Sequence, residues 1–181
     1  MEASDVIART RRWISSMVIG LGLCPFAERV FKAETIRYVV SESTTTTALL
    51  IELSLELTTL AQTPRTSLET AFLIHPHVLS DFREYNDFLG MAETLVKEQG
   101  LKGKIQVVGF HPKYQFQNTT SESVENYTNR SPYPMIHLLR EQSISEVAAK
   151  PDELLEIPRR NIKTLNQMGL AKILERLKNE V

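Results

Sequence analysis

The chain has 181 residues, of which 42% are hydrophobic and 24% are charged, and these proportions are those of a soluble globular domain rather than of a disordered or fibrous protein. Its 21 basic and 22 acidic residues leave a net charge of −1, so we expect neither a nucleic-acid nor a membrane partner. No apolar run approaches the ~20 residues of a membrane span, and the single cysteine, Cys24, excludes an internal disulfide and favours a reducing, cytoplasmic location.

Hydrophobic periodicity predicts helices and strands in alternation over the first 110 residues. A first helix follows Ser4, a second carries the leucines of segment 49–60, and a third, over 79–96, ends before Gly100. Runs rich in β-branched and apolar residues predict strands, and these runs lie at 36–40, 70–74 and 105–110.

This alternation predicts an α/β fold, with residues 1–181 forming a single domain. We expect a small, mainly parallel sheet of three or four strands flanked by helices. Because the C-terminal ends of parallel strands meet at one edge, where ligands usually bind, His75 and His111 would lie side by side after their strands. A ferredoxin-like α+β arrangement is the alternative, and it would separate these two residues.

The segment after the third strand is harder to assign. Residues 111–131 lack strong periodicity and predict a long loop within the domain, one that aromatic residues such as Tyr114 help to order. Ser131 and Pro132 are typical of an N-cap and a first helical position. They predict a helix that carries His137.

The C-terminal third is predicted to be helical and to cover the sheet. Ser143 and Glu146 form a capping box, while Pro151, Pro158 and Gly169 predict that this region is divided into short helices. We assign no chemistry to its basic residues.

Histidines form the first candidate site. His75 and His111 are each followed by proline, and neutral imidazoles both bind zinc and titrate near neutral pH. His77, Asp81 or Cys24 would complete a ligand set, but their spacing matches no strict zinc pattern. We therefore predict no cofactor, with zinc as the alternative. The other interpretation is that His75 and His111 only bond to neighbouring backbone.

A candidate anion site follows at Asn129, Arg130 and Ser131. At a helix start, free backbone N–H groups favour an anion, and Arg130 offers a fork that suits carboxylate or phosphate. Alternatively, Asn129 and Ser131 only cap the helix while Arg130 pairs with a nearby acid.

Cys24, Asn86 and Tyr114 complete the candidates, and each has two interpretations. Cys24 precedes a predicted short helix over 25–31, a position that lowers a thiol pKa, but a lone cysteine is more often a small buried hydrophobe. Asn86 interrupts the apolar face of its helix, so it either binds a ligand or is a satisfied core amide. Tyr114 either contributes to binding or packs within its loop.

These residues predict an enzyme that acts on a small anionic molecule bound at the anion site. Its catalytic candidates are His75, His111, His137 and Cys24. The alternatives are a non-catalytic module that binds a small metabolite and a protein-interaction domain that uses the 111–131 loop. Catalysis requires a histidine whose titration is perturbed close to the anion, whereas binding requires only the pocket.

Four segments resemble one protein family. They read CPFA from Cys24, DFREYNDFL over 81–89, FHP over 110–112 with Tyr114 and Phe116 behind it, and TNRSPYPMIHLLRE over 128–141. Together they are similar to the mostly bacterial family called domain of unknown function 1415, over nearly the whole chain as far as the region of residues 160–162. The resemblance implies no particular reaction. It implies site histidines at 75, 111 and 137 rather than at 77.

Overall fold

A four-stranded sheet forms the centre of the molecule, and the computed structural model describes residues 2–146 and 151–180 of the chain. The strands are β1 (Ile36–Val40), β2 (Thr70–Ile74), β3 (Ile105–Phe110) and β4 (Met135–Arg140), in the order β1-β2-β4-β3. Strand β1 pairs in parallel with β2, while β4 is antiparallel to both β2 and β3.

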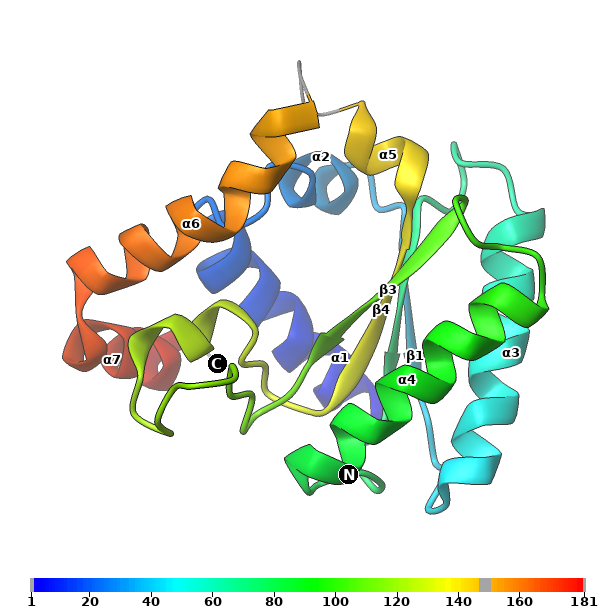
Figure 1. The fold of residues 1–181 in the computed structure, drawn as a ribbon, viewed down its shortest axis with the longest axis horizontal. Helices are drawn as coiled ribbons and strands as arrows, with labels where there is room; N and C mark the ends of the chain where they lie inside the picture. Colours follow the sequence, from blue (N-terminus) through cyan, green and yellow to red (C-terminus); the bar gives the residue numbers. More distant parts are fainter. Residues whose placement is uncertain (1, 147–150, 181) are drawn as a thin grey trace.

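Helices cover both faces of this sheet (Figure 1). On one face lie α3 (Thr46–Gln62) and α4 (Phe82–Glu98). On the other side lie α1 (Ala3–Trp13), α2 (Ala27–Lys32), α6 (Pro151–Met168) and α7 (Leu170–Glu180). The short helix α5 (Glu141–Ser145) continues directly from β4. Among the described helices, none is long and apolar enough to cross a membrane.

The α/β fold class and the three expected strands are confirmed, but the mainly parallel sheet is wrong in detail. The difference is segment 135–140, which forms β4 instead of the predicted helix. Residues from Met135 to Leu139 are all buried, as in a strand covered on both faces. Ser131 and Tyr133 each precede a proline, and that position is biased towards extended backbone. This bias and the burial outweigh the helix-start signal.

The expected edge of the sheet nevertheless exists. Because β2 and β3 are both antiparallel to β4, they run in the same direction, which is also that of β1. Their C-terminal ends meet at one edge, where β4 begins. The backbone N–H of His75 donates to the carbonyl of Pro134 at 3.0 Å, and that of His111 donates to the carbonyl of Asn129 at 3.1 Å. The segment that leads into β4 therefore lies between them.

Each face of the sheet has its own core, because side chains alternate along a strand. Leu73 of β2 and Ile136 of β4 pack against α3 and α4. Phe72 and Met135 face the opposite way and pack with Trp13 of α1. His137 follows the same alternation and stacks on Phe72 with ring centroids 3.9 Å apart. It is therefore on the opposite face from His75, whose ring packs on α4.

Several connecting segments differ from expectation. The first helix begins without a side-chain cap and ends in a π-helix, η1 (Ile14–Ile19). The 111–131 segment contains a 3₁₀ helix, η2 (Val124–Thr128), and folds around Asn126, whose fully buried amide bonds to three neighbours in the loop. Helix α6 continues through Pro158, so this proline does not divide it. Gly100 has the predicted left-handed conformation, with φ +68°.

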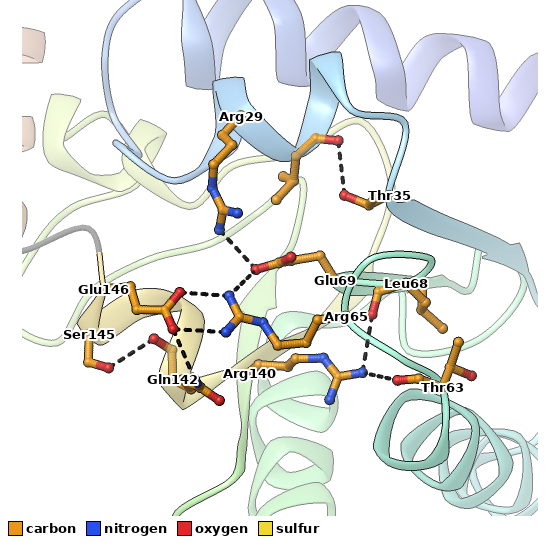
Figure 2. Close-up of polar contacts among 11 residues, drawn as sticks. Arg29, Thr35, Thr63, Arg65, Leu68, Glu69, Arg140, Gln142, Ser145 and Glu146 are labelled. Atoms are coloured by element: carbon orange, nitrogen blue, oxygen red, sulfur yellow. Dashed lines mark hydrogen bonds and ion pairs between the residues drawn. The ribbon is translucent and has the colours of Figure 1, made fainter.

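A cluster of charged side chains fixes the N-terminal end of β2 (Figure 2). Arg65 binds both carboxylate oxygens of Glu146 at 2.8 and 2.7 Å and also binds Glu69 at 2.9 Å. Arg29 of α2 reaches the same Glu69 at 2.8 Å, and Arg140 donates to three backbone carbonyls around the end of α3. The cluster joins α2 and α5 to the sheet, and each charged group in it has a partner.

Candidate functional site

His75 and His111 lie close together at the expected edge but are enclosed in the core. Tyr85 of α4 contacts both rings, with centroids 5.8 Å from His75 and 4.9 Å from His111. The exposed fractions of the two histidines are 0% and 1%. A ligand approaching from solvent therefore meets neither ring.

Hydrogen bonds to backbone occupy both of these histidines. Nδ1 of His75 donates to the carbonyl of Val78 at 3.1 Å, and Nε2 of His111 donates to that of Leu79 at 3.1 Å. Nδ1 of His111 accepts from the N–H of Lys113 at 3.0 Å. Burial lowers the pKa of His75 to about 4 and also lowers the pKa of His111. Both imidazoles are neutral at pH 7 and hold the loop that follows β2.

Arg130 and Ser131 precede a strand, so the helix N-terminus expected at this point is wrong. The guanidinium of Arg130 donates to the carbonyls of Tyr114 at 3.1 Å and Ser121 at 2.7 Å, and it lies 4.5 Å from the ring centroid of Tyr127. Ser131 donates within its own turn, to the carbonyl two residues on. Both Arg130 and Ser131 therefore donate hydrogen bonds to carbonyls of their own loop.

Asn129 takes no part in these contacts of Arg130. Its amide nitrogen donates to the carbonyl of Gly109 at 3.2 Å, and its oxygen accepts from Thr128 at 2.9 Å. It thus ties the loop to the end of β3. It also lines a cavity on the face of the sheet away from α4, described below.

The remaining candidates lie on or near the surface. Tyr114 is half-buried between Phe82 and Phe116, with ring centroids 5.1 and 5.0 Å away, and burial raises its pKa. Asn86 is exposed on α4, so the expectation that it interrupts a buried face is wrong. His77 is exposed, and its Nε2 lies 3.6 Å from a carboxylate oxygen of Glu42.

Zinc would need ligands that the fold does not gather. Asp81, one of the ligands considered above, caps α4 by accepting from the N–H groups of Arg83 and Glu84. Across residues 2–146 and 151–180, no group of three or more His, Cys, Asp or Glu side chains is placed to hold a metal ion.

The structure does bring Cys24, His137 and Asn129 to one place, a chamber between the sheet and the α1 side of the molecule. The chamber consists of two adjoining cavities, an inner one of about 150 Å³ and an outer one of about 270 Å³. Both are lined by Val18, Cys24, Val108 and Phe110. Cys24 therefore stands where the two compartments meet.

The two compartments differ in chemistry. The inner one is lined mainly by apolar side chains, among them Trp13, Phe26, Ala27, Phe72 and Leu139, together with His137. The outer one adds three polar residues, Thr128, Asn129 and Asn161. The chamber is thus apolar at its inner end and hydrogen-bonding at its outer end.

Contacts with α6 fix the wall that carries Cys24. The amide nitrogen of Asn161 donates to the carbonyl of Leu23 at 2.7 Å, and Arg160 donates to that of Gly22 at 3.4 Å. Residues 22–24 are in this way held between η1 and α6. The arrangement depends on segments almost 140 residues apart in the sequence.

Cys24 carries a half-buried thiol with opposing influences on its charge. Burial raises its pKa, while the backbone N–H groups of Phe26 and Ala27 and the charge of Arg160 act to lower it. The net direction is upward, so the prediction of a lowered pKa is wrong. Helix α2 begins at Ala27, two residues later than predicted. The thiol is protonated at neutral pH.

His137 is held in one tautomer. Thr70 donates its hydroxyl hydrogen to the carbonyl of Leu138 at 2.6 Å, so at 2.8 Å it accepts from Nε2 of His137. Nδ1 is left as an acceptor, without a hydrogen-bond partner in the part of the chain that the structure describes. Burial lowers the pKa of His137 to about 3. The ring is therefore neutral at pH 7, with Nε2 as a donor to Thr70 and Nδ1 as an acceptor.

Sequence reasoning missed several groups at the chamber, notably Thr70, Arg160 and Asn161. One signal was available for Asn161, because it precedes Leu165 by one helical turn and both are buried on α6. The positions of Thr70 and Arg160 depend on pairing between distant segments, and no local pattern indicates them.

The chain belongs to the family described as "Protein of unknown function (DUF1415)", whose model matches residues 5–175. This confirms the resemblance inferred from the four motifs. No curated protein and no solved structure matches the chain. Three of the segments that carry the resemblance contribute to the chamber, and these are residues 24–27, 110–116 and 128–141.

Proposed function

We propose that this protein binds a small molecule in the chamber between the sheet and helices α1, α2 and α6. The observation that supports this most directly is that an apolar cavity adjoins an outer cavity that carries amide and hydroxyl groups. Pockets that bind small molecules are mostly apolar and contain a few polar groups that orient the ligand. Three of the four family motifs contribute residues to the lining of this chamber.

Binding fits the electrostatics better than proton transfer does. An effective general base has a pKa near the working pH, whereas His137, the histidine in the chamber, has a pKa lowered to about 3. His75 and His111 are neutral and enclosed on the opposite face. The expected role of Arg130 as an anion clamp gains no support from a guanidinium already bound to two carbonyls.

A protein-interaction role for the 111–131 loop has less support. Its aromatic residues Tyr114, Phe116 and Tyr127 are half-buried and contact other parts of the chain or of the loop. The exposed large hydrophobic side chains among the described residues lie on helices, not in this loop.

The test uses Cys24 as a reporter, since it is the only cysteine. A metabolite library is screened by thermal shift, and each stabilising compound is then tested for protection of Cys24 against iodoacetamide, followed by mass spectrometry. We expect the compounds that raise Tm to slow alkylation of Cys24. Compounds that raise Tm without protecting Cys24 would contradict the proposal, as would a library with no stabilising compound.

A thiol-dependent enzyme is the second candidate. One observation favours it: two backbone N–H groups and Arg160 act on the sulfur of Cys24, an environment that stabilises a thiolate once burial is relieved or a ligand is bound. Under this alternative, Cys24→Ser retains ligand binding and abolishes turnover. Under binding alone, Cys24→Ser retains both affinity and any biological readout of the wild-type protein.

A further inference from the structure

We infer that the ligand of the chamber is a small amphipathic anion, with an apolar group about the size of a benzene ring in the inner compartment and a carboxylate or similar head in the outer one. This inference rests on the proposed binding function and specifies the chemical class of the ligand. The argument takes the two compartments in turn.

The inner compartment has the size and lining of a cavity for one ring. An engineered cavity of ~150 Å³ lined by apolar side chains stays dry and takes up benzene, and the inner compartment measures about 150 Å³. Aromatic rings line it, and the ring centroid of Phe110 lies 5.3 Å from that of Trp13 and 6.5 Å from that of Phe72. Such rings favour edge-to-face and tilted contacts with another aromatic group.

A charged head would not enter the inner compartment, because desolvation of an unpaired ion is too costly there. The outer compartment is suited to it. Thr128, Asn129 and Asn161 line this compartment, and Asn161 is held in place through its bond to Leu23. The hydroxyl hydrogen of Thr128 is donated within the loop, and Asn129 and Asn161 each donate one amide hydrogen to a backbone carbonyl. The second amide hydrogens of the two asparagines are therefore the donors available to a carboxylate.

The charges near the chamber indicate that the head group of the ligand is negative. None of the described residues that line either compartment is aspartate or glutamate. Arg160 is exposed and lies beside the wall of the outer compartment, where its guanidinium donates to the carbonyl of Gly22 at 3.4 Å, next to the lining residue Leu23. Its neighbour Arg159 is different, because it pairs with Glu156 at 3.0 Å. The chamber therefore combines an apolar inner end with an outer end that has a guanidinium beside its wall and no carboxylate among its lining residues.

The experiment measures the affinity of phenylacetate, of its neutral analogue phenylacetamide and of acetate by calorimetry. We expect phenylacetate to bind most tightly, since only it fills both compartments. Arg160→Gln should weaken phenylacetate about threefold, the effect expected of an exposed charge pair, and leave phenylacetamide unchanged. Arg159→Gln removes the same charge from the adjacent position and should change neither affinity.

Ala27→Leu tests the inner compartment. Ala27 lies on its wall and is nearly buried, so the added carbons should fill the cavity, raise the Tm of the free protein and abolish binding of both phenyl compounds. That rise in Tm shows that the variant folds. Unchanged phenylacetate affinity in Ala27→Leu would overturn the placement of the ring.

The outcomes separate this inference from the binding function. Equal affinities for phenylacetate and phenylacetamide, or a loss in Arg159→Gln equal to that in Arg160→Gln, would overturn the anionic head. If none of the three probes binds but library compounds of other chemistry protect Cys24, the ligand class is wrong and the binding function remains. If neither the probes nor any library compound protects Cys24, both fail.

Discussion

Mild acid should destabilise this protein through its buried histidines. Burial lowers the pKa of His75 to about 4 and that of His137 to about 3, whereas both titrate near ~6.5 in an unfolded chain. Below pH ~6.5 the unfolded state therefore binds more protons than the folded state. The stability is fully present above that pH and falls as the pH is lowered towards the folded pKa values.

The size of the effect at pH 5 follows from the unfolded pKa. At ~1.5 units below it, each histidine that stays neutral in the folded state lowers the free energy of unfolding by about 2 kcal/mol, at ~1.4 kcal/mol per unit. The two residues together remove about 4 kcal/mol, a large part of the ~5–15 kcal/mol of an ordinary domain. The lowered pKa of His111 adds in the same direction.

Urea unfolding at pH 7.5 and pH 5.0 measures this loss in the wild type and in a His75→Asn/His137→Gln double variant. Asn at position 75 keeps a donor for the Val78 carbonyl, and Gln at position 137 keeps one for Thr70. We expect the variant to be less stable at pH 7.5 but to lose about 4 kcal/mol less on acidification. Carboxylates contribute equally to both proteins and cancel. An identical loss in the two proteins would refute the assignment of neutral, buried imidazoles.

Three further predictions concern residues that surround the enclosed histidines or the chamber. A Cβ at Gly109 would lie 2.7 Å from both Leu89 Cδ1 and Tyr85 Oη, so Gly109→Ala should lower the free energy of unfolding in urea by about 1–3 kcal/mol. Adding Leu89→Ala should restore part of this loss, and full wild-type stability of Gly109→Ala would contradict the close contact. Tyr85→Phe removes the 2.8 Å hydrogen bond to the carbonyl of Met135 and should cost about 1 kcal/mol; equal midpoints in urea would show that this bond contributes nothing. Arg160→Gln should raise the pKa of Cys24, because Arg160 lowers it; iodoacetamide should then react more slowly at pH 7 than with Arg159→Gln, and equal rates would rule out the influence of Arg160.

Local sequence patterns were sufficient for the region from residue 36 to residue 110. The strands at 36–40, 70–74 and 105–110 have the bounds that their apolar runs predict. Helices α3 and α4 follow Thr45 and Asp81, whose side chains cap them. In this region the favoured local structure and the packed structure agree, as is expected of a sequence with little frustration.

The helix predicted from Ser131 failed because the local signal conflicted with burial. Ser131 and Pro132 are typical of a helix start, but the run from Met135 to Leu139 is almost entirely apolar and enters the middle of the sheet. A strand inserted between β2 and β3 satisfies its backbone hydrogen bonds on both sides. Pairing of this kind joins Phe72 with His137, 65 positions along the chain, and no local pattern reports it.

Only part of the candidate site could be predicted, again because contacts between distant segments determine the rest. The edge that joins His75 and His111 follows from strand direction, and it exists. Which face of the sheet each side chain takes depends on register, and a shift of one residue reverses it. The chamber depends further on the packing of α1, α2 and α6 across the sheet. Cys24 and His137 were therefore identified as residues but not as neighbours of one cavity.

The cost in stability of leaving the inner compartment unfilled also favours a functional role for it. An empty cavity costs about 24 cal/mol per Å³ in a core, so an inner compartment of about 150 Å³, which opens into the outer one, corresponds to at most about 3–4 kcal/mol. A larger side chain at Ala27, on the cavity wall, would recover much of this without disturbing α2, because leucine is a good helix former. A cavity that one substitution could fill, but that the sequence keeps, is typical of a site that a ligand occupies. A ligand that occupies it should stabilise the fold in proportion to its concentration over its Kd.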